Sequence, residues 1–101
     1  MSDQVTVMAH LVARPEKVDE TRAFLMSLIE RTRAENGCVD YDLHQSDDNP
    51  AEFSFYENWI SREALDRHME TPYLKELVER KDEFLALEPD VRLMTMISKR
   101  K

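Results

Sequence analysis

Glycine and cysteine are almost absent from this sequence, whose 101 residues contain one of each, Gly37 and Cys38. Glycine-rich phosphate loops and dinucleotide-binding fingerprints need several glycines at fixed spacing. We therefore do not expect a nucleotide or a flavin held in the Rossmann manner. A single cysteine also excludes an internal disulfide, forms no thiolate cluster for zinc, and is typical of a reducing compartment.

Long apolar runs and an excess of basic residues are missing too. No segment is apolar enough to span a bilayer and no charged-then-apolar leader opens the chain, so we expect a cytoplasmic protein without membrane contact. The formal net charge of −7 disfavours nucleic acid as a partner. The remaining composition, 42% apolar and 35% charged, is that of an ordinary globule, and we assign residues 1–101 to one domain.

Apolar and polar residues alternate in four segments, with the period of a β-strand. These segments are residues 4–13, 38–45, 52–60 and 90–98. The turn-forming stretch SDDNPA separates the second from the third and predicts a hairpin. In the second segment, alternation places three residues on one face, namely Val39, Tyr41 and Leu43.

Helical patterns lie between these strands. Residues 14–37 predict one helix, with a buried face formed by Val18, Thr21, Leu25, Leu28, Ile29 and Thr32. Ser61 is a good N-cap for a second helix, and Thr71-Pro72 starts a third. The order predicts an α+β fold, a ferredoxin-like βαββαβ antiparallel sheet with helices on one face.

The face of the sheet without helices is expected to meet a partner. The first strand is apolar on both faces, and the last offers Leu93 and Ile97 on one side with Met94 and Met96 on the other. An uncovered apolar face marks an interaction surface. A homodimer that pairs sheet against sheet is the simplest arrangement.

The candidate site lies in the segment from residue 53 to residue 74. On a helical wheel, at about 100° per residue, His68 falls between Ala64 and Leu65 and faces the sheet. The preceding strand directs four side chains to one face, namely Phe53, Phe55, Glu57 and Trp59. An imidazole, an indole and a carboxylate beside apolar walls predict a small pocket for a flat aromatic ligand.

Each of these residues also has a purely structural interpretation. A histidine on an apolar helix face is often a core residue bonded to backbone groups, and a tryptophan is more often core than site. Glu57 can point to water or to Arg62. We expect His10 and His44 on the surface and Cys38 as a small buried residue, and the histidines lack the local spacing of a zinc site.

A resemblance to the antibiotic biosynthesis monooxygenase family lies in the stretch GCVDYDLHQSDDNPAEFSFYENWISREALDRHMETPYLKEL. It rests on the Gly-Cys before a strand, the Asn-Pro turn, the Phe/Tyr-Glu-x-Trp strand end, the Ser-x-Glu-Ala helix start, and His68 followed by Thr71-Pro72. VMAHLVARPEKVDE is similar to that family's first strand and helix entry. The resemblance implies a dimeric α+β barrel whose pocket is lined at the positions of Trp59 and His68. The sequence departs from the family pattern at Tyr73, where several relatives carry histidine. It also lacks the first-strand asparagine of the haem-degrading members.

This resemblance implies a monooxygenase that oxidises a small aromatic, such as a quinol, an anthrone or a polyketide, with O2 and without a cofactor. A deprotonated quinol can itself reduce oxygen, so the protein has to supply a base, a dry cavity and an oriented substrate. We expect His68 as the base and Trp59 as a wall that stacks on the ring. Substrate contacts are expected from Glu57, Phe55, Tyr73 and Leu65.

Two other functions stay open at this point. The family also includes an isomerase of a phosphorylated autoinducer sugar, which needs cations near the pocket, and the sequence offers Arg14, Lys17 and Arg67. The second is a dimer that binds a small ligand without catalysis. A water-accessible polar pocket beside His68 favours an enzyme, whereas a site sealed by Phe55 and Leu65 favours the binding module.

Overall fold

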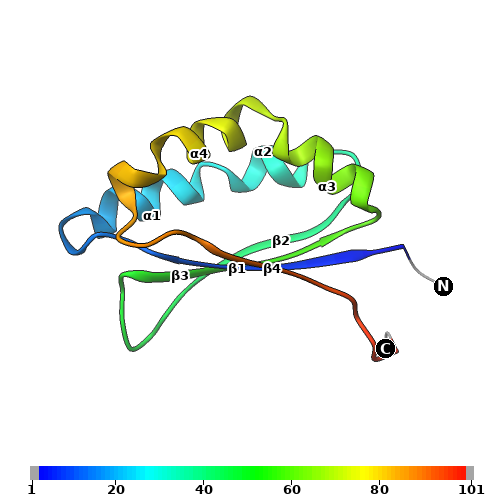
Figure 1. The fold of residues 1–101 in the computed structure, drawn as a ribbon, viewed down its shortest axis with the longest axis horizontal. Coiled ribbons are helices and arrows are strands. Elements are labelled where there is room, and N and C mark those ends of the chain that lie inside the picture. Colours follow the sequence, from blue (N-terminus) through cyan, green and yellow to red (C-terminus); the bar gives the residue numbers. More distant parts are fainter. Residues whose placement is uncertain (1–2, 100–101) are drawn as a thin grey trace.

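The computed structural model describes residues 3–99, and Figure 1 shows a sheet with every helix on one side. The sheet is antiparallel with strand order β2-β3-β1-β4, which confirms the ferredoxin-like fold. No helix in this part of the chain has the length and apolar character needed to cross a membrane. The elements are β1 Val5–Val12, the 3-10 helix η1 Pro15–Lys17, α1 Val18–Met26, α2 Ile29–Arg33, β2 Cys38–Gln45, β3 Glu52–Trp59, α3 Arg62–Met69, α4 Pro72–Phe84 and β4 Asp90–Met94.

The core fills the space between the helices and the sheet. Alternate residues of β1 and β3 face it, so that Val7 and Leu11 pack beside Phe53 and Phe55. The helical positions predicted to be buried are buried with one exception, Val18, which is half-buried. The buried positions are Thr21, Leu25, Leu28, Ile29 and Thr32.

The prediction of one helix over residues 14–37 is wrong, because the structure divides this segment into η1, α1 and α2. At the second division the Ser27 hydroxyl donates to the Phe24 carbonyl, and the Leu28 N–H donates to Leu25, three residues back instead of four. A serine that bonds to its own helix backbone competes with the regular ladder. The resulting turn allows consecutive residues, Leu28 and Ile29, both to be buried.

Two side-chain caps fix the start of α3 and of α4, as the sequence predicts. The Ser61 hydroxyl accepts a hydrogen bond from the Ala64 N–H at 3.1 Å. The Thr71 hydroxyl accepts from the Leu74 N–H, and proline occupies the first position of α4. These caps leave α3 only two turns long and place His68 near its end.

Two strands differ from expectation. In β2 a register shift between Cys38 and Asp40 makes Val39 a bulge residue that is 42% exposed, so it does not share the buried face of Tyr41. The sequence predicts the last strand over residues 90–98, but the strand ends at Met94, and all five of its residues are exposed. It lies at the sheet edge, where only β1 pairs with it.

The face of the sheet without helices is more polar than the sequence suggests. Asn58 is buried there at 1% exposure and accepts a hydrogen bond from the Thr6 hydroxyl. Its amide nitrogen donates to Asp40 at 2.9 Å, and Gln4 donates to its oxygen at 3.1 Å. This network fixes β3 against β1 and β2 and explains why a buried amide is tolerated.

Candidate active site

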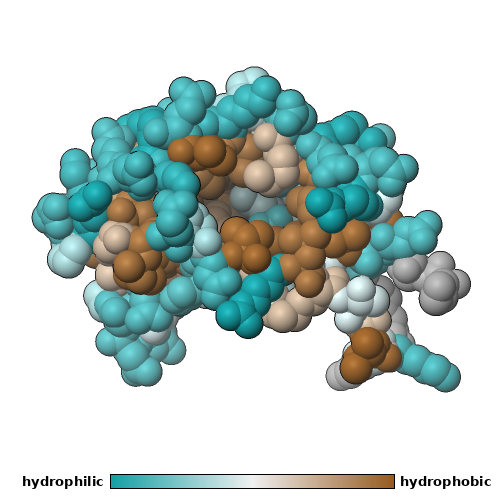
Figure 2. Space-filling view, in the orientation of Figure 1, coloured by the Kyte–Doolittle hydropathy of each residue, from teal (hydrophilic) through white to brown (hydrophobic). Residues whose placement is uncertain are grey.

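A cavity of about 310 Å³ lies between the sheet and the α3–α4 segment. Figure 2 shows it as a hollow in one face of the molecule, with apolar side chains around it. Its walls come from β1, β2, β3, β4, α3 and α4, and they are mostly aliphatic or aromatic. The polar or charged residues among them are Tyr41, Glu57, Arg62, Asp66, His68 and Lys81.

His68 is almost completely buried, at 2% exposure. Its ring lies on Trp59 with a centroid distance of 4.5 Å and an interplanar angle of 34°, and it meets the Tyr41 ring edge-on at 5.4 Å. Nδ1 lies 2.9 Å from a carboxylate oxygen of Glu35. Burial lowers the pKa of His68, and the opposing effect of Glu35 is smaller, so the imidazole is neutral at pH 7.

Glu57 places a carboxyl group inside the same cavity, at 6% exposure. The Trp59 indole N–H donates to its Oε1 at 3.0 Å. Burial raises the pKa of Glu57 to about 7, and the charge of Glu35 adds to this, whereas the indole hydrogen bond opposes it. A carboxyl group with this pKa exchanges protons near neutral pH, which is the property of a general acid or base.

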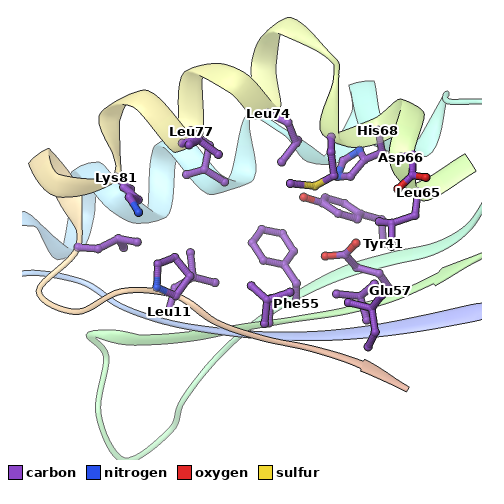
Figure 3. Close-up of a pocket in the computed structure, with 18 of the residues that line it drawn as sticks. Leu11, Tyr41, Phe55, Glu57, Leu65, Asp66, His68, Leu74, Leu77 and Lys81 are labelled. Atoms are coloured by element: carbon purple, nitrogen blue, oxygen red, sulfur yellow. The ribbon is translucent and has the colours of Figure 1, made fainter. Parts of the chain in front are cut away.

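Tyr41 is a cavity residue that sequence reasoning did not select. Burial raises the pKa of its phenol, and the nearby Glu57 carboxylate raises it further, so the hydroxyl stays protonated. In Figure 3 the oxygen atoms of Tyr41 and Glu57 point into the same space below α4. The signal was present in the alternation of β2, which put Tyr41 on the inner face.

Glu35 is the second residue that sequence reasoning missed. It lies between α2 and β2, where Gly37 adopts a φ of 93°. A Cβ on Gly37 would be 2.7 Å from the Cβ of Ala64, so this turn approaches α3 more closely than another residue permits. This close packing of the turn on α3 places Glu35 beside His68, which lies one helical turn after Ala64. No local motif predicts such a contact.

The structure brings four of the predicted site residues to the cavity wall, namely His68, Glu57, Phe55 and Leu65. Trp59 is fully buried behind His68 and does not line the cavity, and Tyr73 also lies outside the lining and donates its hydroxyl proton to Glu35. Burial and the Glu35 hydrogen bond raise the pKa of Tyr73 to about 12. The ring of Trp59 is therefore in contact with the imidazole instead of the cavity.

Other candidates lie away from the cavity. His10 contacts Ser54 and Glu52 on the opposite face of the sheet, and the exposed His44 shares that face. Cys38 is half-buried, and burial raises the pKa of its thiol to about 11. Among residues 3–99, no group of three or more His, Cys, Asp or Glu is arranged to hold a metal ion. The cations expected for a phosphate, Arg14, Lys17 and Arg67, do not line the cavity.

Comparison with known proteins gives this site its family context. The model of the family "antibiotic biosynthesis monooxygenase" matches residues 4–80. The chain belongs to this family. A Synechocystis protein of unknown function, sll1783, is 33% identical over 91 residues, which cover 90% of this chain and 62% of that protein. The chain thus spans less than two thirds of this relative.

Two similar proteins of known structure share the fold over nearly their full length. Rv0793 of Mycobacterium tuberculosis, which is named as a candidate monooxygenase, is 41% identical over 73 residues, 72% of this chain and 71% of its own. Its structure superposes with a TM-score of 0.90 and 33% identity, covering 97% of this chain and 99% of that one. PA3566 of Pseudomonas aeruginosa gives a TM-score of 0.91 with 28% identity, covering 97% and 98%.

Proposed function

We propose that this protein is a cofactor-independent monooxygenase that oxidises a small aromatic substrate, of the quinol or anthrone type, with O2. The observation that carries the proposal is the pairing, in one apolar cavity, of a neutral imidazole and a carboxyl group with a pKa of about 7. The cavity volume of about 310 Å³ is at the lower end of the range for small-ligand sites. Family membership supports the reaction class.

In this proposal His68 removes a proton from the substrate hydroxyl or activated CH2 group, and Glu57 binds a second oxygen of the substrate. Deprotonation makes the aromatic electron-rich enough to reduce O2. The substrate then loses two hydrogen atoms and gains one oxygen atom, while the other oxygen leaves as water. All four electrons that reduce O2 come from the substrate, so the stoichiometry needs no further reductant. The apolar walls keep water from the anion.

Oxygen uptake by the metal-free protein tests this proposal across a panel of hydroquinones, naphthoquinols and anthrones. We expect saturable uptake above autoxidation, and a loss of about 100-fold or more in kcat for His68→Ala, because a positioned base contributes at least that much. His44→Ala is the matched control, because His44 is exposed on the opposite face of the sheet.

Either of two results contradicts the proposal. If the His68→Ala variant takes up oxygen at the same rate as the wild type, His68 is not the base. No uptake above background across the whole panel removes the oxygenase reaction and favours a dimer that binds a ligand without catalysis.

The isomerase alternative has little support in the cavity, because an isomerase of a phosphorylated sugar needs cations to bind the phosphate. The two cationic residues that line the cavity are already paired, Arg62 with Asp66 and Lys81 with Glu88.

We also infer that the protein functions as a homodimer. All five residues of β4 are exposed, and its outer edge is unpaired among the described residues. Three of these five are apolar, Val91, Leu93 and Met94, at 54%, 46% and 40% exposure. An exposed apolar edge strand is a surface that proteins usually cover. A second copy placed over β4 and the open sheet face supplies that cover.

A further inference from the structure

The carboxylate of Glu35 stands outside the cavity but contacts His68 in the cavity wall and Tyr73 behind it. The Glu35 side chain is 14% exposed, one carboxylate oxygen lies 2.9 Å from His68 Nδ1, and the same oxygen accepts a hydrogen bond from the Tyr73 hydroxyl. Tyr73 is itself held by the Arg31 guanidinium, which lies 4.7 Å above its ring. These three residues, Tyr73, Glu35 and His68, form a continuous hydrogen-bonded cluster that joins the α2–β2 turn to α3 and α4.

The chemistry of this cluster determines which nitrogen of His68 carries the proton. An ionised carboxylate only accepts hydrogen bonds, so Nδ1 must donate. On a neutral imidazole, Nε2 is then the acceptor. The contacts with Trp59 and Tyr41 are ring-to-ring contacts that restrain the plane of the imidazole, and they are not hydrogen bonds to either nitrogen. Glu35 is the group that distinguishes the two nitrogens.

We propose that Glu35 is a positioning residue, which holds His68 as the Nδ1–H tautomer and leaves Nε2 to accept the substrate proton, with Tyr73 restraining the carboxylate. This inference rests on the proposed function for the step that uses Nε2. The tautomer itself is a property of the ligand-free protein and is independent of any substrate. Glu35 acts through His68 and touches no reacting atom.

Nitrogen-15 NMR of the histidine rings measures the tautomer directly. The chain has three histidines, and His68→Ala identifies the signals of His68 by their loss. We expect the wild type at neutral pH to show the pattern of a protonated Nδ1 and an unprotonated Nε2. Glu35→Ala is expected to shift both ring nitrogens toward the values of a tautomer mixture. Glu30→Gln, an exposed substitution on α2, is the control and should leave them unchanged.

Glu35→Gln keeps the size of the side chain and one acceptor oxygen, so it carries the test if Glu35→Ala does not fold. Its amide group can also donate to Nδ1, so the population of the Nδ1–H tautomer should fall. On a quinol that the wild type oxidises, we expect kcat to fall about 10- to 100-fold while KM changes less than about twofold, which is the effect of losing a charge-assisted hydrogen bond to the base.

The two arms separate this inference from the proposed function. Ring nitrogen signals that stay the same in Glu35→Ala and Glu35→Gln overturn it, whatever the activity. If the tautomer shifts in these variants but the wild type oxidises no quinol, the positioning role of Glu35 is supported and the oxygenase function is refuted. A fall in kcat without any change in tautomer also overturns it, because Glu35 then acts by another route.

Discussion

At the scale of single residues, the site depends on removing ionisable groups from water. Glu57 and His68 are both almost completely buried, and burial is the main cause of both pKa shifts. Because burial disfavours the charged form, it raises the pKa of the acid and lowers that of the base. At pH 7 the imidazole of His68 is therefore neutral, and Glu57 is divided between its protonated and ionised forms.

The Glu57 shift predicts a pH dependence of stability. Its pKa rises from 4.5 in the unfolded chain to about 7 in the folded one. The protonated side chain thus favours folding below pH 4.5, and this contribution is lost as the pH rises to about 7. Between these limits, the free energy of unfolding of the wild type should fall by roughly 3 kcal/mol relative to Glu57→Gln. Urea unfolding of both proteins across this range measures the difference.

Gln at position 57 retains an oxygen that accepts the hydrogen bond from the Trp59 indole. The comparison therefore isolates the titration from the loss of that contact. Parallel stability curves for the two proteins would show that Glu57 titrates at its ordinary pKa, and the pairing of a neutral imidazole with a carboxyl group of pKa about 7, on which the proposed function rests, would fail with it.

At the scale of elements, the turn between α2 and β2 connects the helices to the site. Gly37 has its carbonyl bonded to the Ile60 N–H at 2.9 Å, and it lies against Ala64 on α3. Glu35, two residues earlier, is thereby held beside His68. The correct placement of one hydrogen bond in the site thus depends on close packing between a turn and a short helix.

Gly37→Ala is expected to destabilise the fold by about 2–4 kcal/mol, because it adds strain at a positive φ and a contact of 2.7 Å with Ala64. Adding Ala64→Gly removes the contact but not the strain, so the double variant should recover part of the loss. A double-mutant cycle by chemical unfolding measures this coupling. Strictly additive effects would mean that the turn relaxes away from α3.

At the scale of the whole molecule, the exposed face of the sheet leads to a prediction about assembly. Met8 and Met94 lie on neighbouring strands of this face, at 43% and 40% exposure. In the isolated protomer a glutamate at either position reaches water, so it should not disturb folding. In a dimer that pairs these faces, it would bury a charge without a partner.

We expect sedimentation to show a wild-type dimer and a monomer for the variant Met8→Glu/Met94→Glu. Met26→Glu serves as the control, because Met26 is 50% exposed on α1, on the other side of the sheet. A monomeric wild type would refute the dimer. A variant that stays dimeric would place the interface elsewhere.

Much of the fold follows from local sequence patterns. Alternation predicts the strands and the inward face that Phe55, Glu57 and Trp59 share, and the caps at Ser61 and Thr71 predict where α3 and α4 begin. These features depend on residues close together in the chain. The break at Ser27 depends instead on a side-chain hydroxyl that competes with the helix ladder, and β4 ends at Met94, which pairs with Thr6 near the start of β1.

The site is predicted less completely, because it is assembled from distant segments. The helical wheel correctly turns His68 toward the core, but Glu35 lies 33 residues away, and only the packing of Gly37 on Ala64 unites them. Trp59 is on the predicted face, yet His68 occupies the space between it and the cavity. The alternation along a strand predicts which way a side chain points, but it does not predict which other side chain lies between it and the cavity.

The alternation along β3 also limits how the length of the chain can vary. Glu57 and Trp59 face the helices, whereas Asn58 faces away and binds Thr6 and Asp40. One residue inserted within the strand would exchange the two faces, turning the amide into the aromatic core and the indole out of it. An insertion in the hairpin turn, at residues 46–51, leaves this phase intact. Natural length variation compatible with the site therefore belongs in the turn and is excluded from β3.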